Sequence, residues 1–232
     1  MQLFYSENIT NQFELSKEES RHLISVLRKS YGDEIVFTDG IGGKYLCKIV
    51  DDNPKRTWLK VEKKEKILRN APNLTIAIAP TKNIDRLEWF LEKSTEIGIT
   101  RIIPFISNHS ERRKIKKERL EKIIVSAMKQ SLKLYKPILE ELTTFDHVLS
   151  MGVGSTKFLA HLDEEKPILF KKLYKPQENL MIVIGPEGDL SKEEILKAKE
   201  NGFKIVSLGD SRLRTETAGI VACHSFNFMN NN

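Results

Sequence analysis

Two glycine-containing turns hold the residues of this 232-residue chain that are best suited to chemistry. The first spans residues 184–194, IGPEGDLSKEE, and the second spans residues 206–219, VSLGDSRLRTETAG. Each runs from an apolar segment through glycine into residues that commonly begin a helix, which is the order of strand, turn and helix. Backbone N–H groups at a helix N-terminus lack intrahelical partners and are free to bind a ligand.

The residue types in the first turn argue against a phosphate ligand. Pro186 biases Gly185 toward extended geometry, and Gly188 permits a close approach of the backbone. The patterns G-x-x-x-x-G-K-[ST] and G-x-G-x-x-G are both absent, and Glu187 and Asp189 would repel phosphate. A nucleoside ligand without phosphate and with positive charge, such as S-adenosylmethionine, suits this turn. A tight turn that binds nothing is the alternative.

The second turn brings arginines to the start of a helix. Arg212 and Arg214 precede Thr215, Glu216 and Thr217, whose side chains are typical of helix N-termini. We expect the two turns to lie side by side at the ends of successive parallel strands, where open α/β sheets bind ligands. A capped helix without a ligand is the alternative for this segment alone.

Basic charge is concentrated in one segment. The formal net charge of the chain is +6. Residues 111–136 contain ten Lys and Arg but three Glu. This concentration favours a polyanionic partner such as RNA, and a solvated helix of mixed charge is the alternative.

Composition argues against several other classes of protein. No apolar run approaches the roughly 18 residues of a membrane helix, and the opening MQLFYSENIT does not resemble a signal peptide. Cys47 and Cys223 lie far apart, and the five histidines have no metal-ligand spacing. We therefore expect a cytoplasmic protein without disulfide or metal.

Residues 1–68 are expected to form a small β-rich module. A helix is predicted from residue 15 to Gly32, with Ser16 and Glu19 as a capping box. Three alternating runs, DEIVFTDG, KYLCKIVDD and RTWLKVEKK, predict a strand meander. The charged residues 62–73 are expected to be a linker.

From residue 74 onward, strands and helices alternate. Strands are predicted at LTIAIAP, RIIPFIS, TKFLAHL, NLMIVIG and FKIVSLG. Helices are predicted at 84–98, about 114–134, 191–201 and 215–228. This alternation predicts an α/β fold with a mostly parallel sheet, and by itself an unknotted one.

Further motifs extend along the chain. The two turns contain GPEG before a capped helix, then LG followed by LRTETA. Upstream, EKSTEIGITRIIPF resembles the pattern EK-x-TELG-x-x-x-I-x-P, and AMKQSLKLYKP resembles A-x-EQS-x-R-x-x-x-P. Nearer the N-terminus, HLISVLR resembles H-x-x-x-VLR, and GDEIVFTDG resembles GD-x-I-x-x-x-DG. Through these motifs, the chain resembles the RsmE-type ribosomal RNA methyltransferases of the SPOUT superfamily. It departs where Asp189 and Leu190 replace the Gly and Phe of GPEGGF, where Lys133 replaces an Arg, and where SRLR replaces RILR.

The resemblance implies a fold and an activity. It implies a PUA-like β-barrel for RNA, here residues 1–68, and a SPOUT α/β domain, here 74–232, with a deep trefoil knot formed by the segments that carry the two turns. The family is a homodimer and uses S-adenosylmethionine to methylate N3 of the uridine numbered 1498 in the 16S rRNA of the small ribosomal subunit. We expect the same of this chain.

The resemblance also assigns roles to residues. The expected cofactor cradle comprises Gly185, Pro186, Glu187, Gly188, Leu208, Gly209, Leu213, Thr215, Thr217 and Ala218. Loss of the N3 proton leaves negative charge on the uracil oxygens, which Arg214 would stabilise. Glu216 would orient Arg214 or the cofactor, or accept the proton; a carboxylate that only favours the helix N-terminus is the alternative. Phosphate contacts are expected from Arg28, Lys82, Arg112, Arg113, Lys116, Lys117, Lys129 and Lys133. For Lys82, a solvated loop lysine without a phosphate partner is the alternative.

Other functions stay open at this point. One is a SPOUT-type enzyme that acts on transfer RNA or large-subunit RNA. Another is a non-catalytic RNA-binding assembly factor with the same fold, although such a factor has no physical need for both intact turns. A phosphate-binding nucleotidase is disfavoured by the acidic side chains of the first turn.

Overall fold

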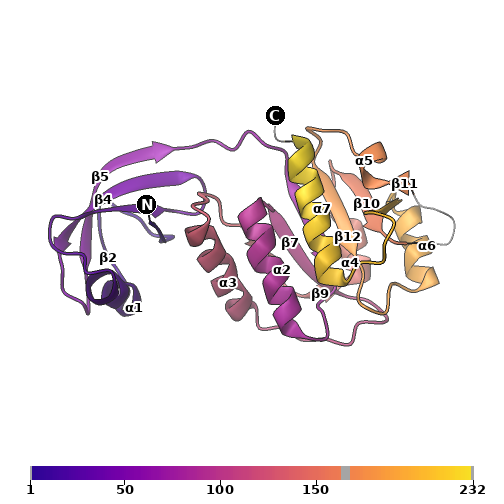
Figure 1. Ribbon diagram of the computed structural model, residues 1–232, viewed down its shortest axis with the longest axis horizontal. Coiled ribbons are helices and arrows are strands. Elements are labelled where there is room, and N and C mark those ends of the chain that lie inside the picture. The colour runs from indigo at the N-terminus through magenta and orange to yellow at the C-terminus, as the bar shows by residue number, and fades with distance from the viewer. Residues whose placement is uncertain (1, 163–167, 231–232) are drawn as a thin grey trace. The chain divides into compact units, whose positions relative to one another are not determined.

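The computed structural model describes residues 2–162 and 168–230 (Figure 1). The chain divides into two compact units. The N-terminal unit comprises Met1–Arg69 with Met128–Lys136, and the C-terminal unit comprises Asn70–Ala127 with Pro137–Asn232. Residues 128–136, which lie within the expected second domain, thus group with the first unit. The domain bounds 1–68 and 74–232 stay a prediction.

The N-terminal unit is built on a five-stranded sheet in the order β1-β3-β4-β5-β2. Its strands are β1 (Leu3–Tyr5), β2 (Gln12–Glu14), β3 (Glu34–Thr38), β4 (Gly43–Asp51) and β5 (Trp58–Lys66). The antiparallel β3-β4-β5 meander confirms the three alternating runs. The expected linker from residue 62 is wrong at its start, because β5 continues to Lys66 through pairing with β4. The short strands β1 and β2 were not predicted.

The helix of the N-terminal unit is shorter than expected. It comprises α1 (Lys17–Arg21) and a π-helix (His22–Val26). Ser16 Oγ accepts a hydrogen bond from Glu19 N at 3.2 Å, as the sequence predicts for an N-cap. The helix ends before Gly32 because Arg28 adopts a left-handed backbone, with φ of 55°.

The β3-β4 turn is organised by one carboxylate. Asp39 accepts hydrogen bonds from Ile41 N at 2.9 Å, Gly43 N at 2.8 Å and Tyr45 Oη at 3.0 Å. Burial alone would raise the pKa of Asp39, but these donors outweigh it and lower that pKa below its ordinary value. The turn is therefore held by an ionised side chain.

Residues 128–136 pack onto this sheet through hydrogen bonds and ion pairs. Leu134 O accepts from Gly42 N at 2.9 Å and from Thr38 Oγ1 at 3.1 Å. Lys129 Nζ lies 2.8 Å from Glu19 Oε1 and 5.4 Å from the centre of the Phe4 ring. These contacts explain why the segment belongs to the N-terminal unit.

The C-terminal unit contains an eight-stranded sheet in which every pair is parallel. The strand order is β11-β13-β10-β12-β6-β7-β8, and β9 pairs with β7. The strands are β6 (Leu74–Ile78), β7 (Arg101–Ile106), β8 (Ile138–Leu139), β9 (Thr143–Thr144), β10 (Thr156–Ala160), β11 (Ile168–Leu169), β12 (Leu180–Ile184) and β13 (Lys204–Ser207). The predicted α/β class and parallel sheet are confirmed.

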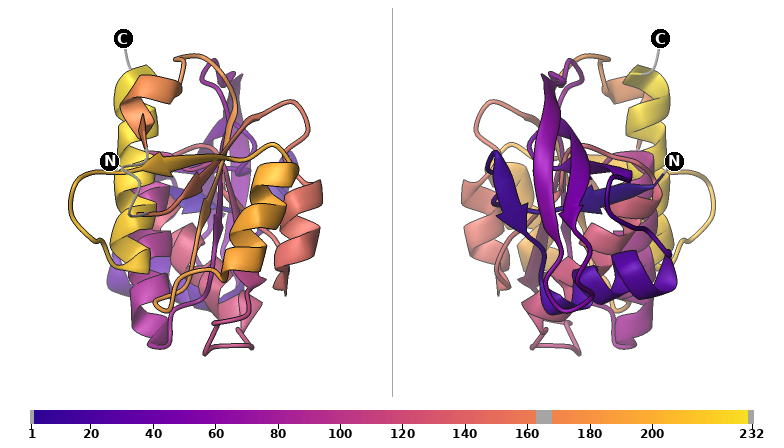
Figure 2. Two further views of the ribbon diagram at one scale, coloured as in Figure 1. Left: turned by 90° about the vertical axis from the view of Figure 1, so that its right-hand side faces the viewer. Right: turned by 90° about the vertical axis from the view of Figure 1, so that its left-hand side faces the viewer.

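Helices cover both faces of this sheet (Figure 2). One face packs against α2 (Ile84–Ile97), α3 (Lys117–Gln130), α5 (Phe170–Leu173) and α7 (Thr215–Asn230), and the other packs against α4 (Phe145–Ser150) and α6 (Lys192–Glu200). A parallel sheet buried on both faces needs continuous apolar strands, and all five residues of β12 are buried. None of the helices in the described part of the chain has the length and apolar content of a membrane span.

Helix boundaries follow their capping residues. Helix α2 ends at Gly98, with φ of 126°, as predicted. Helix α6 begins after Ser191 with the predicted capping box to Glu194. The basic helix α3 is shorter than the predicted 114–134, because its first residues form a loop and Leu132 has a left-handed backbone.

The expected adjacency of the two turns is wrong in one respect. The strands that precede them, β12 and β13, are not neighbours, because β10 lies between them and pairs with both. All three strands are parallel, so their carboxyl ends still meet at one edge of the sheet. The end of β10 therefore lies between the two turns at this edge of the sheet.

Candidate functional site

A cavity of about 610 Å³ lies at this carboxyl edge of the C-terminal sheet. Its wall comes from the ends of β10, β12 and β13 and from the first turn of α7. The lining residues are Ala160, His161, Leu162, Ile184, Gly185, Pro186, Glu187, Asp189, Val206, Ser207, Leu208, Gly209, Ser211, Arg212, Leu213, Arg214, Thr215 and Ala218. The position matches the edge where open α/β sheets bind ligands.

Eight of the ten residues expected in a cofactor cradle line this cavity. They are Gly185, Pro186, Glu187, Leu208, Gly209, Leu213, Thr215 and Ala218. The other two, Gly188 and Thr217, do not line it. A Cβ on Gly188 would lie 3.2 Å from His109 Cβ, so this glycine lies against the loop after β7.

The two turns are joined by a hydrogen bond. Thr215 Oγ1 at the start of α7 donates to Gly185 O at 3.0 Å, and Thr215 is 5% exposed. Within the second turn, Ser207 Oγ bonds to the backbone of Gly209, whose φ of 155° disfavours other residue types. The hydrogen bond from Thr215 therefore connects the two turns although the strands that precede them are not adjacent.

The loop after β7 holds the first turn from outside. Glu194 Oε1 accepts from Asn108 N and Glu194 Oε2 accepts from Ser191 N, both at 2.8 Å. His109 Nδ1 lies 3.1 Å from both Gly188 O and Asp189 O, so this nitrogen carries a proton and donates to them. A further tie comes from the loop after β6, where Lys82 N donates to Glu187 Oε1 at 3.0 Å.

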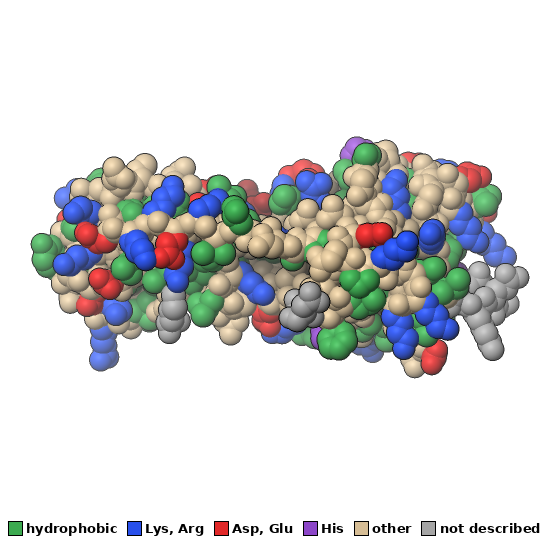
Figure 3. All heavy atoms as spheres, turned by 90° about the horizontal axis from the view of Figure 1, so that it is seen from above, with side chains coloured by type: hydrophobic (Ala, Val, Ile, Leu, Met, Phe, Trp, Pro, Cys, Tyr) green, Lys and Arg blue, Asp and Glu red, His purple; other side chains and the backbone are tan. Residues whose placement is uncertain are grey.

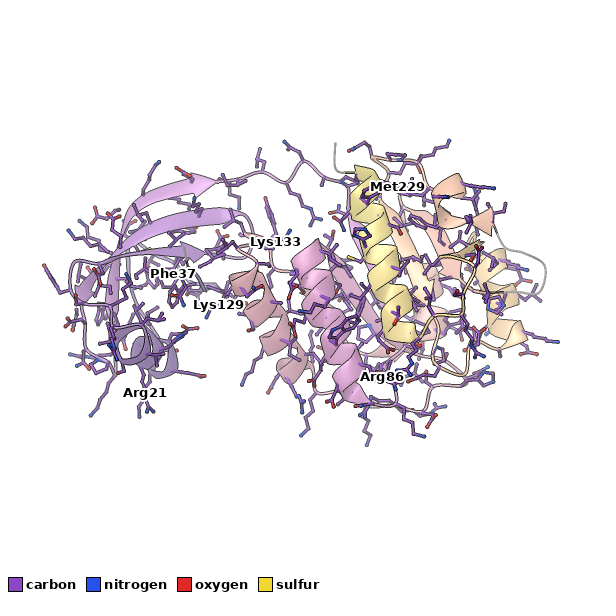
Figure 4. All side chains as sticks on the ribbon, viewed as in Figure 1. Arg21, Phe37, Arg86, Lys129, Lys133 and Met229 are labelled. Atoms are coloured by element: carbon purple, nitrogen blue, oxygen red, sulfur yellow. The ribbon has the colours of Figure 1, made fainter. Side chains whose placement is uncertain are left out.

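The two expected catalytic residues differ in environment. Arg214 is exposed and lines the cavity, and within the described residues no hydrogen bond or ion pair holds its guanidinium. Glu216 is 7% exposed and does not line the cavity. Its Oε1 lies 3.8 Å from Arg86 Nε, near the start of α2 (Figure 4), and its Oε2 has no hydrogen-bond partner among the described residues.

Several lining residues were missed by sequence reasoning. The end of β10 contributes Ala160, His161 and Leu162, because β10 inserts between β12 and β13. Strand order is not encoded in a local motif, so no single segment of the sequence indicates these residues. Asp189 and Arg212, by contrast, stand inside the two quoted turns and were identifiable as candidates.

Four expected phosphate contacts in the C-terminal unit have protein partners. Lys82 Nζ lies 2.8 Å from Glu111 Oε2, and Lys117 Nζ lies 2.7 Å from Glu141 Oε1. Arg112 donates through Nε to Thr81 O at 3.0 Å and through Nη2 to Lys82 O at 2.7 Å, and Arg113 Nη2 donates weakly to Asn108 O at 3.5 Å. Lys116 lines a second, shallower hollow beside α3. Exposed ion pairs are weak, so Lys82 and Lys117 can still exchange partners.

The expected phosphate contacts of the N-terminal unit are Arg28, Lys129 and Lys133. Lys129 is bound to Glu19, whereas Arg28 is exposed and Lys133 is half-buried. Figure 4 shows Lys129 and Lys133 at the end of α3 and just beyond it. On the face of each unit seen in Figure 3, Lys and Arg side chains are interspersed with Asp and Glu.

Residues 2–162 and 168–230 contain no cluster of side chains that could bind a metal ion. No group of three or more His, Cys, Asp or Glu side chains there is arranged to hold an ion. Cys47 is buried, and burial raises the pKa of its thiol to about 12.

Comparison with known proteins identifies the family. A family model described as an RNA methyltransferase domain matches residues 69–227, and one described as an RNA methyltransferase PUA domain matches residues 15–62. Ribosomal RNA small subunit methyltransferase E of Rickettsia conorii is 31% identical over 91% of this chain and 88% of its own length.

Solved structures agree with these matches. A probable rRNA-methyltransferase from Porphyromonas gingivalis has a TM-score of 0.94 and 39% identity, covering 99% of this chain and 98% of that one. A ribosomal RNA small subunit methyltransferase E from Neisseria gonorrhoeae, bound to S-adenosyl methionine, has a TM-score of 0.89 and 26% identity with the same coverage. The chain therefore belongs to the ribosomal RNA small subunit methyltransferase E family of RNA methyltransferases, with a PUA-like N-terminal domain.

Proposed function

We propose that this protein methylates N3 of the uridine numbered 1498 in 16S rRNA, with S-adenosylmethionine as the methyl donor. The observation that carries the proposal is the cavity in which both glycine turns and Arg214 meet. Membership of the methyltransferase E family supports the substrate, and the relative from Neisseria gonorrhoeae that binds S-adenosyl methionine supports the cofactor.

The cavity fits this cofactor in size and chemistry. Its volume of about 610 Å³ falls within the range of small-molecule sites. The acidic side chains Glu187 and Asp189 line it, which suits a ligand with a sulfonium and an ammonium and does not suit a polyphosphate. The cofactor would be held by the eight cradle residues that line the cavity, mainly through backbone groups. When bound, S-adenosylmethionine supplies an electrophilic methyl group on sulfur.

Arg214 is proposed to stabilise the charge that develops on the uracil ring. N3 becomes nucleophilic when its proton leaves, and negative charge then spreads over the two flanking carbonyl oxygens. A guanidinium beside those oxygens favours this ionised form. Arg214 suits the role because it lines the cavity and is not bound to another side chain or carbonyl of the described residues.

Glu216 is proposed to take part in the reaction although it is buried and does not line the cavity. Its carboxylate is buried, and Arg86 at 3.8 Å balances its charge incompletely. A buried carboxylate oxygen without a partner is costly, so Oε2 is suited to accept a hydrogen bond or a proton when substrate binds. Orientation of the segment that carries Arg214 is the second role proposed for it.

Three further features complete the proposal. The protein acts as a cytoplasmic homodimer, and the segments of the two turns form a deep trefoil knot, which the family relation supports. Arg28, Lys82, Arg112, Arg113, Lys116, Lys117, Lys129 and Lys133 contact RNA phosphates, so binding falls steeply with salt. Methylation at N3, on the pairing edge of the base, requires the uridine to be unpaired or flipped out.

The test is methyl transfer from labelled S-adenosylmethionine to 30S subunits and to free 16S rRNA, both from a strain that lacks the modification. Nucleoside mass spectrometry should show N3-methyluridine. Arg214→Ala should lower turnover about 100-fold while the cofactor dissociation constant, measured by calorimetry, changes little. Arg214→Lys keeps the charge and is the matched variant. Equal turnover of wild type and Arg214→Ala would end the role proposed for Arg214.

A non-catalytic assembly factor predicts a different result. Such a protein would bind the small subunit without transferring a methyl group, and calorimetry would detect no S-adenosylmethionine binding. Binding of the cofactor with no incorporation into 30S subunits or 16S rRNA would instead favour another RNA as substrate.

A further inference from the structure

Most acidic and hydroxyl groups of the cavity wall are already bonded within the protein. Thr215 Oγ1 donates to Gly185 O, and Ser207 Oγ bonds the backbone of Gly209. Glu187 accepts a hydrogen bond from Lys82 N, and the positive charge of the Lys82 side chain lies nearby. These bonds shape the wall: the two hydroxyls are used within the protein, and Glu187 has one of its two oxygens bonded.

Asp189 is the second acid that lines the cavity. Its Oδ1 accepts from Leu190 N at 2.8 Å, and its Oδ2 lies 3.0 Å from Nδ1 of His161. The Asp189 side chain is 47% exposed and lines the cavity. One oxygen is thus fixed to the turn and the other remains accessible to a ligand.

The backbone of the turn holds this carboxylate in place. Asp189 has φ of 62°, a left-handed conformation that glycine adopts freely and aspartate tolerates. His109 donates to the carbonyls of Gly188 and Asp189 and fixes the conformation from outside the cavity. The family pattern GPEGGF has glycine here, which satisfies the same backbone requirement without a carboxylate. The carboxylate is therefore an addition to the family's turn.

His161 lies beside the carboxylate within the cavity wall. Its side chain is 13% exposed. A carboxylate only accepts hydrogen bonds, so an Nδ1 atom at 3.0 Å is favourable when it carries a proton. The two groups are close without the alignment of a hydrogen bond. His161 therefore restrains Asp189 electrostatically and leaves Oδ2 able to accept from a ligand.

We propose that Asp189 recognises the positive charge of the cofactor and that His161 is its positioning residue. This rests on the proposed function, because the cavity must bind S-adenosylmethionine. The other charged groups in the wall support the assignment: Arg212 and Arg214 repel a cation, and Glu187 Oε1 already accepts from Lys82 N. The Asp189 carboxylate lines the cavity with 47% of its side chain exposed, and so it is placed to meet the sulfonium or ammonium.

The test compares a charged ligand with a neutral one by calorimetry. S-adenosylmethionine carries the sulfonium and the ammonium, whereas 5′-methylthioadenosine retains the adenosine and sulfur without either charge. Asp189→Asn should weaken S-adenosylmethionine binding about tenfold or more, the usual effect of losing a hydrogen bond to a charged group, and leave 5′-methylthioadenosine binding unchanged. Asp210→Asn is the control, since Asp210 is an exposed acid in the second turn that does not line the cavity. It should leave both affinities unchanged.

His161→Phe keeps a ring of similar size and removes Nδ1. It should weaken S-adenosylmethionine binding selectively, and the double variant with Asp189→Asn should bind no more weakly than Asp189→Asn alone. Additive losses would contradict the positioning role. If Asp189→Asn does not fold, Asp189→Gly gives the same test on a backbone that glycine adopts freely.

Two results would overturn the inference. One is wild-type affinity of Asp189→Asn for S-adenosylmethionine, and the other is an equal loss of affinity for both ligands. Failure of the wild-type protein to bind S-adenosylmethionine would contradict the proposed function itself, so the two failures are distinguishable.

Discussion

Replacing Thr215 by valine should loosen the connection between the two glycine turns. Valine keeps the shape of threonine but removes Oγ1, which donates to Gly185 O at 3.0 Å in a position 5% exposed. A buried hydrogen bond contributes about 1 kcal/mol, and a carbonyl left without its donor costs about 1–3 kcal/mol. We therefore expect a loss of about 1–2 kcal/mol in unfolding free energy. For a chain of this size that corresponds to a melting temperature lower by roughly 2–8 °C.

The effect on cofactor binding should be similar in size to the effect on folding. The first turn and the start of α7 both line the cavity, so a shift between them changes the cradle directly. Calorimetric titration with S-adenosylmethionine should show binding weakened about tenfold, equivalent to about 1.4 kcal/mol. Thr215→Ser keeps the hydroxyl and should stay close to wild type. Wild-type melting and affinity for Thr215→Val, measured beside Thr215→Ser, would refute the view that this hydrogen bond assembles the site.

Three other predictions concern the stability of the two units. Gly219→Ala should lower the melting temperature, because the new Cβ would lie 2.6 Å from a ring carbon of fully buried Phe90; overpacking costs about 1–3 kcal/mol and outweighs about 1 kcal/mol of gained helix propensity. Ser191→Ala removes the cap of α6 and should cost about 1 kcal/mol in urea unfolding, with Ser191→Thr as the conservative control. The pKa of Asp39 is lowered in the folded state, so the ionised carboxylate stabilises the fold. This stabilisation is present above the unfolded-state pKa of about 3.9 and is lost as pH falls through the lower folded-state pKa. Asp39→Asn should therefore be less stable than wild type at neutral pH, and the difference should shrink in acid; a constant difference across pH would contradict this.

Local patterns in the sequence were sufficient to predict much of the fold. The apolar runs gave β6, β7, β10, β12 and β13, because a parallel sheet covered on both faces requires continuous hydrophobic strands. Ser191 with Glu194 and Gly98 fixed helix ends through caps that involve only neighbouring residues. Glycines and acids in the two turns likewise indicated most of the cavity wall.

Features that depend on residues distant in sequence could not be predicted in this way. Strand order decides that β10 lies between β12 and β13, and so brings His161 to the cavity. The grouping of residues 128–136 with the N-terminal unit depends on hydrogen bonds to Thr38 and Gly42, about 90 residues away along the chain. The helix after Ser16 ended early because Arg28 adopts a left-handed backbone, which its residue type does not indicate.

The most direct test of the proposed activity is reverse transcription through 16S rRNA taken from 30S subunits treated with this protein. A methyl group on N3 blocks the pairing edge of uridine, so extension should stop next to position 1498. The stop should require S-adenosylmethionine and should be strongly reduced with Arg214→Ala. A stop at another position would contradict the proposed target, and no stop in the presence of bound cofactor and wild-type protein would contradict methylation at N3 of this uridine.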